Sequence, residues 1–230
     1  MDRRTMLGTM AAGALGAELA AKGLSGSPVV LSTQVDPLAD YVAQPFDFGT
    51  GLPGLSKDLL AEHLTLYKGY VTRTNALLKD VLAAEKEGKA GAMVQELRRR
   101  LGFEFSGMRV HECYFEGLSA KAPAAAATHP LHRAIAATWG SHEAWWAAFK
   151  ATCTMPGIGW GALVKDPVTG RLMNAWFQDH ENAIPVGVQP LLVVDVWEHA
   201  YVKDYGATGR GKYVDALKPL LNWMVVEKRY

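Results

Sequence analysis

The chemistry of this chain is concentrated in one short stretch, DVWEHAYV, which spans residues 195–202 and follows the apolar run PLLVV. Asp195 and His199 stand four residues apart, and a second acid, Glu198, directly precedes the histidine. Burying a carboxylate or an imidazole without a partner is costly, so polar groups placed beside an apolar run need hydrogen-bond partners or a metal ion. The stretch therefore predicts that partner groups come from elsewhere in the chain.

Two histidines on apolar helical faces are the candidates for these partners. His63 falls at helical spacing with the leucines and tyrosines around it, and His111 does the same in a later segment. Taken singly, each is more typical of a hydrogen-bonded core histidine than of a metal ligand. Together with Asp195 and His199 they would supply three imidazoles and one carboxylate, a donor set that iron, manganese and zinc all accept.

Composition excludes several classes of function. The chain has 230 residues, of which 49% are hydrophobic and 20% charged, and its formal net charge is +1. These values are ordinary for a soluble globular protein and give no electrostatic case for binding nucleic acid or a membrane surface. Two cysteines, Cys113 and Cys153, are too few for a disulfide framework or a four-thiolate zinc site, although a single bridge between them stays open.

The N-terminus has the features of an export signal. Arg3 and Arg4 precede a mildly apolar stretch from residue 6 to about residue 21, and this order resembles a twin-arginine signal. The stretch is too short and too rich in glycine and alanine to span a bilayer comfortably. We therefore expect residues 1–24 to be a signal and the mature protein to be soluble, exported or periplasmic, and not membrane-bound. A leader without function is the alternative.

The elements that must position the candidate ligands fall into two parts. After an extended leader at 25–54, the spacing of apolar residues predicts a helical hairpin domain at 55–121, with Ser56 as the N-cap of its first helix. In the second helical segment a break is expected between Gly102 and Gly107. A Pro/Ala linker at 121–130 then separates this part from the next.

The second part, residues 130–230, is expected to be an α/β domain. Two helices meet at Gly140, two strands flank the turn DPVTG, and QPLLVVDVW forms a third, buried strand. The fold class is therefore α+β, a long N-terminal helical hairpin followed by an α/β half with a three-stranded antiparallel sheet.

Four motifs resemble the iron/manganese superoxide dismutase family. DVWEHAY is close to the family motif whose Asp and His bind the metal, AEHLTLYKGYV and GMRVHECYF resemble its two ligand-bearing helices, and GIGWGALV resembles its central strand. The match continues to Asn222 and Trp223, so it covers roughly residues 53–225. The resemblance implies that His63, His111, Asp195 and His199 bind one iron or manganese ion per chain.

The resemblance also implies an activity. Members of the family convert superoxide to dioxygen and hydrogen peroxide by one-electron cycling of mononuclear iron or manganese, whereas zinc in the same ligands could not cycle. They assemble as homodimers or tetramers, and we expect Glu198 and Tyr201 at the interface, where each Glu198 would bind the partner's ligand histidine.

Residues next to the metal are expected to control the proton on bound solvent. In the family this role falls to a glutamine or histidine, and the segment FQDHEN offers His180 first and Gln178 second. Trp160 and Trp197 are expected to wall the pocket, although on composition alone both would pass as core aromatics.

The chain departs from the family pattern at the substrate gateway. The family carries histidine four residues and tyrosine eight residues after the first ligand, where this chain has Tyr67 and Val71, with Tyr70 at seven. Steps of four and seven both remain on the ligand face of a helix, so Tyr67 and Tyr70 are both candidates for proton delivery. Phe115 replaces a tryptophan of the family.

These departures leave a second hypothesis open. The chain could be a metal-binding protein of the superoxide dismutase fold with little or altered catalytic activity. A hydrolytic metalloenzyme is a third hypothesis, but it would need a second free acid as a general base, and the sequence places none there.

Overall fold

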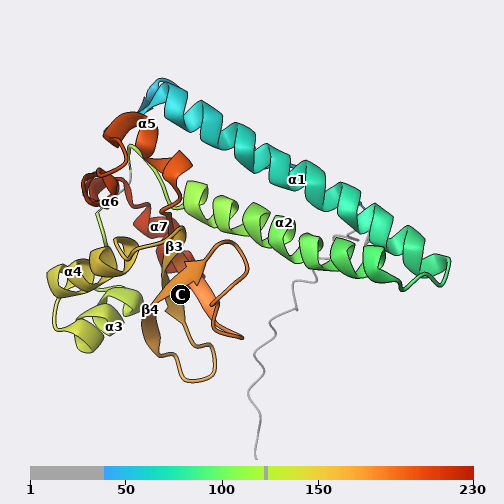
Figure 1. Cartoon of the computed structure of the whole chain (residues 1–230). Helices are drawn as coiled ribbons and strands as arrows, with labels where there is room; N and C mark the ends of the chain where they lie inside the picture. The colour runs from blue at the N-terminus through green and yellow to red at the C-terminus, as the bar shows by residue number, and fades with distance from the viewer. Residues whose placement is uncertain (1–38, 122–123) are drawn as a thin grey trace, which may run out of the picture. The chain divides into compact units, whose positions relative to one another are not determined.

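The computed structural model describes residues 39–121 and 124–230, and the structural statements below concern these residues. The expected export signal at 1–24 and most of the leader lie outside the described residues. Figure 1 shows two long helices on one side of the molecule and, on the other, a sheet with shorter helices around it.

The helical hairpin consists of α1 (Lys57–Lys86) and α2 (Ala92–Glu116), which pack along one another. A small antiparallel pair, β1 (Gly51–Leu52) and β2 (Leu55–Ser56), leads into α1. The expected N-cap is confirmed, because the Ser56 side chain accepts a hydrogen bond from the Leu59 N–H at 3.1 Å.

The expected break in the second helical segment is wrong, since α2 runs without interruption for 25 residues. The glycines serve close packing instead. A Cβ atom on Gly107 would lie 2.7 Å from Cδ1 of Tyr70, and one on Gly102 would lie 2.9 Å from a carboxylate oxygen of Glu181. Glycine costs a helix only about 1 kcal/mol relative to alanine, so tertiary contacts override its weak propensity.

The described end of the leader packs against the hairpin. Tyr41 exchanges two hydrogen bonds of 2.9 Å with the Asn75 side chain, and the Phe46 ring lies 5.3 Å from that of Phe115. The Gln44 N–H donates to the Tyr67 hydroxyl at 2.8 Å. The extended segment is therefore part of the packing around the buried face of the hairpin.

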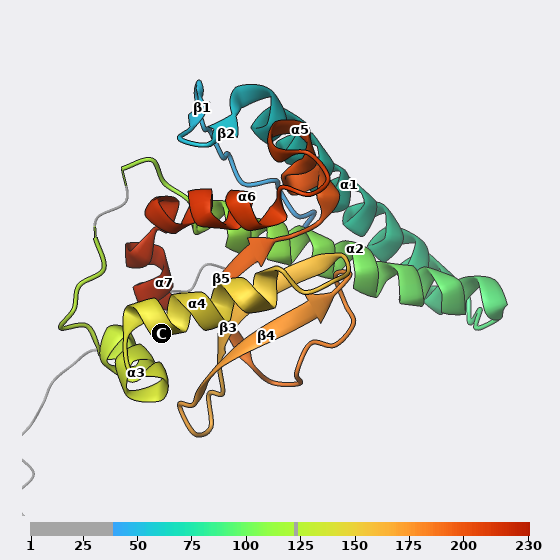
Figure 2. The same cartoon turned by 60° about the vertical axis from the view of Figure 1, so that its left-hand side comes forward.

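The α/β half begins with α3 (Pro130–Trp139) and α4 (His142–Cys153), which meet at Gly140 as expected. Three antiparallel strands follow, β3 (Gly159–Lys165), β4 (Leu172–Gln178) and β5 (Gln189–Asp195), in the order β4-β3-β5. Figure 2 shows α4 lying over the sheet, where it packs on β3 and β4, while α2 contacts β5. The α+β class with a three-stranded antiparallel sheet is thus confirmed.

Short helices complete the chain. They are the 3₁₀ turn η1 (Glu198–Ala200), α5 (Val202–Tyr205), α6 (Arg210–Leu217), the 3₁₀ turn η2 (Lys218–Leu220) and α7 (Trp223–Arg229). Residues 40–230 form one compact unit with a continuous apolar core to which the hairpin and the α/β half both contribute. The boundaries of a helical and an α/β domain within this unit stay a prediction.

Two further features bear on the expectations from sequence. Cys113 and Cys153 are free thiols, and Cys153 is buried tightly against Gly161 of β3. Within residues 39–121 and 124–230, no helix combines the length and the apolar character that crossing a bilayer requires.

Candidate metal centre

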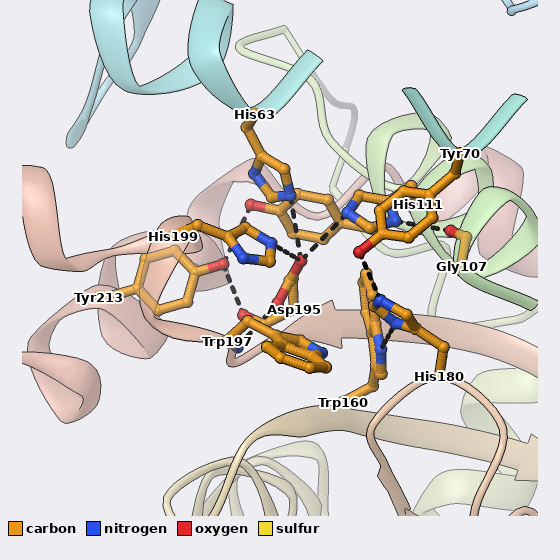
Figure 3. Close-up of polar contacts among 11 residues, drawn as sticks. His63, Tyr70, Gly107, His111, Trp160, His180, Asp195, Trp197, His199 and Tyr213 are labelled. Atoms are coloured by element: carbon orange, nitrogen blue, oxygen red, sulfur yellow. Dashed lines mark hydrogen bonds and ion pairs between the residues drawn. The ribbon is translucent and has the colours of Figure 1, made fainter. Parts of the chain in front are cut away.

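Four side chains from four elements meet between the two halves of the molecule. His63 comes from α1, His111 from α2, Asp195 from the end of β5 and His199 from η1 (Figure 3). One potential ligand atom from each lies within 4.8 Å of all the others. The first three side chains are fully buried and His199 is largely so. We refer to these four residues as the metal cluster.

The imidazoles converge on one carboxylate oxygen. Oδ2 of Asp195 lies 3.0 Å from Nε2 of His63, 3.2 Å from Nε2 of His199 and 3.7 Å from Nε2 of His111. The other oxygen, Oδ1, accepts a hydrogen bond from the Trp197 N–H at 2.8 Å. Each side chain thus presents an atom with a lone pair to the same small volume.

His111 gives the clearest test of whether these residues fit a metal ion. Its Nδ1 lies 2.6 Å from the carbonyl oxygen of Gly107, which can only accept, so Nδ1 carries the hydrogen. A neutral ring then leaves a lone pair on Nε2, and this buried atom has no hydrogen-bond partner. Burying such a group unsatisfied is costly. A metal ion at this point would satisfy it, so the residues present fit the group.

The protonation states of three of the four residues also suit a metal. Burial lowers the pKa of His63, although Asp195 opposes the shift, and burial together with His63 lowers the pKa of His111 well below its usual value. Burial alone would raise the pKa of Asp195, but His199 and His63 outweigh it and hold that pKa far below its usual range. Burial likewise would lower the pKa of His199, and Asp195 outweighs it and raises the value. Neutral imidazoles and an ionised carboxylate are the forms that bind metals, so His63, His111 and Asp195 favour the binding form, whereas a protonated His199 would release its proton on binding.

Tyr70 and His180 form a hydrogen-bonded pair beside the metal cluster. Nε1 of Trp160 donates to Nδ1 of His180 at 3.1 Å, and because an indole N–H can only donate, neutral His180 carries its hydrogen on Nε2. Nε2 lies 2.7 Å from the Tyr70 hydroxyl and therefore donates to it (Figure 3). Burial lowers the pKa of His180 to about 4, which keeps the ring neutral at neutral pH.

This arrangement leaves the hydroxyl hydrogen of Tyr70 unused. In the described part of the chain, Tyr70 makes no side-chain hydrogen bond other than the one from His180. Its ring lies 5.0 Å from that of His111. The hydroxyl hydrogen of Tyr70 is therefore available for a further hydrogen bond.

The other candidates next to the cluster differ in what they can do. The Tyr67 hydroxyl donates to Glu112 at 2.9 Å, so its hydrogen is already used. Gln178 is exposed at the end of β4, whereas His180 is buried. The Trp197 ring packs on His180 at 4.9 Å between centroids, and that of Trp160 packs edge-on against His111 at 4.8 Å.

The two expected interface residues lie in different surroundings. Glu198 is exposed beside His199, at a pocket of about 330 Å³. Tyr201 is buried within its own chain, where its ring stacks on Tyr213. The pocket is lined by Glu62, His63, Leu66, Glu198, His199, Val202 and Lys203.

One contact at the site had no signal in the sequence. The hydroxyl of Tyr213 donates to the backbone carbonyl of Asp195 at 2.8 Å, and its oxygen lies 3.0 Å from the hydroxyl of Tyr114. These buried tyrosines fix the end of β5 from behind. Both look like ordinary core residues at helical spacing, so only the tertiary structure reveals the contact.

Comparisons with known proteins agree with this geometry. The family model for the C-terminal domain of iron/manganese superoxide dismutases matches residues 127–229, a range that contains Asp195 and His199 but not His63 or His111. Superoxide dismutase (Mn) 2 of Haloferax volcanii is 31% identical over 204 residues, which are 87% of this chain and 96% of that protein.

Two further relatives come from other organisms. Superoxide dismutase (Mn/Fe) of Propionibacterium freudenreichii is 32% identical over 81% of this chain and 93% of its own length. Superoxide dismutase (Fe) of Tetrahymena pyriformis is 34% identical over 77% of this chain and 93% of its own length. With such identity over nearly the whole length of these relatives, the chain belongs to the iron/manganese superoxide dismutase family.

Proposed function

We propose that this chain is a superoxide dismutase, an oxidoreductase that converts superoxide to dioxygen and hydrogen peroxide with one iron or manganese ion per chain. His63, His111, Asp195 and His199 are the proposed ligands. The observation that carries the proposal is the convergence of three Nε2 atoms on Oδ2 of Asp195, with the buried Nε2 of His111 left without a hydrogen-bond partner.

The donor set suits a small anionic substrate. Three neutral imidazoles and one carboxylate carry a single negative charge, so a divalent or trivalent cation leaves the site net positive. When bound, iron or manganese supplies one-electron redox chemistry. Two superoxide ions and two protons give one dioxygen and one hydrogen peroxide, so the protein must deliver protons to a buried site.

Tyr70 and His180 are the proposed route for these protons. Trp160 fixes His180 as the Nε2–H tautomer, His180 donates to Tyr70, and Tyr70 directs its own hydroxyl hydrogen towards the bound anion. Tyr67 is less suited, because its hydrogen is held by Glu112. Tyr70, seven residues after His63, thus takes the part that the family gives to a tyrosine at eight.

The names of the relatives agree on the activity but differ on the metal. Their names specify manganese for Haloferax, iron for Tetrahymena and either metal for Propionibacterium, and the same four donors serve both ions. Because these relatives match over most of their length and are all named superoxide dismutases, a metal-binding protein with little activity is not favoured.

Metal loading and radiolysis test the proposal. The protein is prepared with iron and, separately, with manganese, and superoxide consumption is followed by pulse radiolysis. We expect at least one form to turn over and His111→Ala to lose both the metal and the activity. A parent protein that binds metal stoichiometrically yet consumes no superoxide with either ion would refute the function.

Assembly as a homodimer or tetramer is a second part of the proposal. Glu198 is exposed directly beside His199, which supports a contact with the same site of a partner chain. Light scattering coupled to gel filtration should find Glu198→Gln shifted towards monomer. Glu87→Gln, a matched change at an exposed acid after α1, should leave the mass unchanged. Equal masses for the two variants would remove Glu198 from the interface.

Export through a twin-arginine signal is a third part, and it rests on the order of residues 1–24 alone. Replacing Arg3 and Arg4 by lysine should retain the protein in the cytoplasm of the producing cell, as judged by fractionation. Unchanged export of the double variant would contradict the assignment.

A further inference from the structure

One acidic side chain near the proton route is buried completely, although it lies outside the metal cluster. Glu104 of α2 has no exposed surface. It binds two guanidinium groups: Nε of Arg73 lies 2.7 Å from Oε2, and Arg100 pairs with Oε1. The two arginine side chains are themselves about half exposed, at 47% and 46%. A single buried carboxylate therefore fixes two charged groups at the protein surface.

Each of these guanidinium groups covers an aromatic ring that belongs to the proton route or packs against it. Arg73 lies 4.8 Å from the ring centroid of Tyr70, and Arg100 lies 4.5 Å from that of Phe103. The Phe103 ring in turn packs on His180 at 4.6 Å. The ring of Tyr70 is thus capped directly by Arg73, and His180 is backed by the Arg100-capped ring of Phe103, with Glu104 binding both arginines.

Ordinary surface stabilisation does not explain this burial. Removing a carboxylate from water costs several kcal/mol, and a guanidinium pair repays this only with good geometry. Farther up the same helix, Glu96 pairs with Arg99 while both side chains remain more than half exposed. That exposed pair keeps its charges largely in water, so it forms on the helix at little desolvation cost. The burial of Glu104 is explained instead if this carboxylate serves to hold Arg73 and Arg100 in fixed positions.

We propose that Glu104 is a positioning residue for the proton route: through Arg73 and Arg100 it fixes the Tyr70 ring against His180 and keeps water from their outer side. This inference rests on the proposed function, in which Tyr70 delivers a proton to bound superoxide. In the described part of the chain, Glu104 forms side-chain hydrogen bonds with Arg73 and Arg100 and with none of the four proposed ligands.

The charged groups around Tyr70 shift the pKa of its hydroxyl in opposite directions. Burial, followed by the charges of Asp195 and Glu104, raises the pKa of Tyr70 to about 12 against the lowering effect of Arg73 and Arg100. The groups that face Tyr70 come from every element packed on it: Arg73 of α1, Glu104 and Arg100 of α2, His180 of the β4–β5 loop and Asp195 of β5.

Glu104→Gln tests the proposal because it preserves shape and removes the charge. With Tyr70 poorly positioned, kcat for superoxide should fall about tenfold, because a small displacement of a proton donor lowers the rate of proton transfer strongly. The ratio kcat/KM should change less than about twofold. A purely electrostatic role predicts the opposite result. Two guanidinium groups left without their counter-ion would attract superoxide more strongly, raising kcat/KM and leaving kcat unchanged.

Glu96→Gln is the matched control, with the same charge change on the same helix, and should alter neither constant. Arg73→Gln, at a half-exposed side chain, should lower kcat in the same way as Glu104→Gln. Arg73→Lys, which keeps the charge next to Glu104, should restore part of it. If Glu104→Gln does not fold, Arg73→Gln decides the question.

A second readout is independent of activity. Nitration of the metal-loaded protein by tetranitromethane, mapped by mass spectrometry, should increase several-fold at Tyr70 in Glu104→Gln and Arg73→Gln, while buried Tyr67 stays unmodified. Unchanged nitration together with unchanged kcat would overturn the positioning role. A metal-loaded parent without superoxide turnover would refute the proposed function instead, and the nitration pattern would still decide whether Glu104 fixes Tyr70.

Discussion

A buried and a partly buried cluster of histidine and carboxylate in this molecule have similar composition but different geometry. In the metal cluster three Nε2 atoms face one oxygen of Asp195. In the second cluster, formed by His132 of α3, His142 of α4 and Glu227 of α7, the groups form a chain. Nε2 of His132 lies 2.6 Å from Oε1 of Glu227, and its Nδ1 lies 2.9 Å from Nε2 of His142.

The difference lies in where the lone pairs point. Both nitrogens of His132 are engaged by separate partners, and Oε1 of Glu227 also accepts the Ala126 N–H at 3.1 Å. Hydrogen bonds within this second cluster thus engage both ring nitrogens of His132, and they link the three helices α3, α4 and α7 of the α/β half. His111, by contrast, keeps a buried Nε2 with no partner. Residue types alone therefore do not define a metal site, because convergence on one point is also required.

The largest expected difference between the clusters is in metal content. His63→Ala should lose the metal and lower superoxide consumption at least about a thousandfold, because the redox ion supplies the chemistry. His132→Ala should keep a full metal complement and lose about 2–3 kcal/mol of stability through its two partly buried hydrogen bonds. Elemental analysis and denaturant titration measure both effects. Metal loss in His132→Ala with retention in His63→Ala would reverse the assignment.

The second effect concerns pH. The pKa of His180 is about 4 in the folded chain, against about 6.5 for an ordinary histidine. Between these values the unfolded chain binds the extra proton, so the free energy of unfolding falls as the pH drops from about 6.5 to 4, by about 3 kcal/mol. His180→Gln should remove this part of the slope. Parallel stability curves for parent and variant would contradict it.

Two tyrosines sharpen the comparison at the level of rate. Tyr70→Phe should lower kcat about tenfold, as expected for a lost proton donor. Tyr67→Phe should leave kcat within about twofold and cost about 1–2 kcal/mol of stability, because Glu112 loses its donor. Pulse radiolysis and thermal unfolding separate the two. A larger loss of kcat in Tyr67→Phe would move the proton route to that residue.

The smallest effect belongs to the second cluster. Glu227→Gln keeps an oxygen that can accept from His132 and Ala126 and removes only the charge, so we expect a loss of about 0.5–1 kcal/mol of stability with metal content and kcat unchanged. Thermal unfolding of the metal-loaded protein measures it. Any change in metal occupancy would couple the two clusters, which the geometry does not provide for.

Local signals in the sequence predicted much of this architecture. The cap Ser56, the turn DPVTG and the apolar faces around His63 act over a few residues and can be read directly. The continuity of α2 could not be, because Gly107 is required by the ring of Tyr70 on another helix. Long-range contacts are invisible in the same way.

In the candidate site, too, local features could be predicted from the sequence and long-range contacts could not. The spacing of Asp195 and His199 marked a centre, whereas the turn of Tyr67 towards Glu112 depends on packing between α1 and α2. The burial of Glu104 under two arginines has the same origin. The chain of His132, His142 and Glu227 joins segments up to 95 residues apart, and no spacing rule connects them.

Anomalous diffraction from crystals of the metal-loaded protein, recorded at the iron and manganese absorption edges, tests the central claim most directly. The account predicts one peak per chain, at bonding distance of about 2 Å from Nε2 of His63, His111 and His199 and from a carboxylate oxygen of Asp195. A peak at the second cluster, or full occupancy by metal with these four side chains turned away from it, would contradict the account.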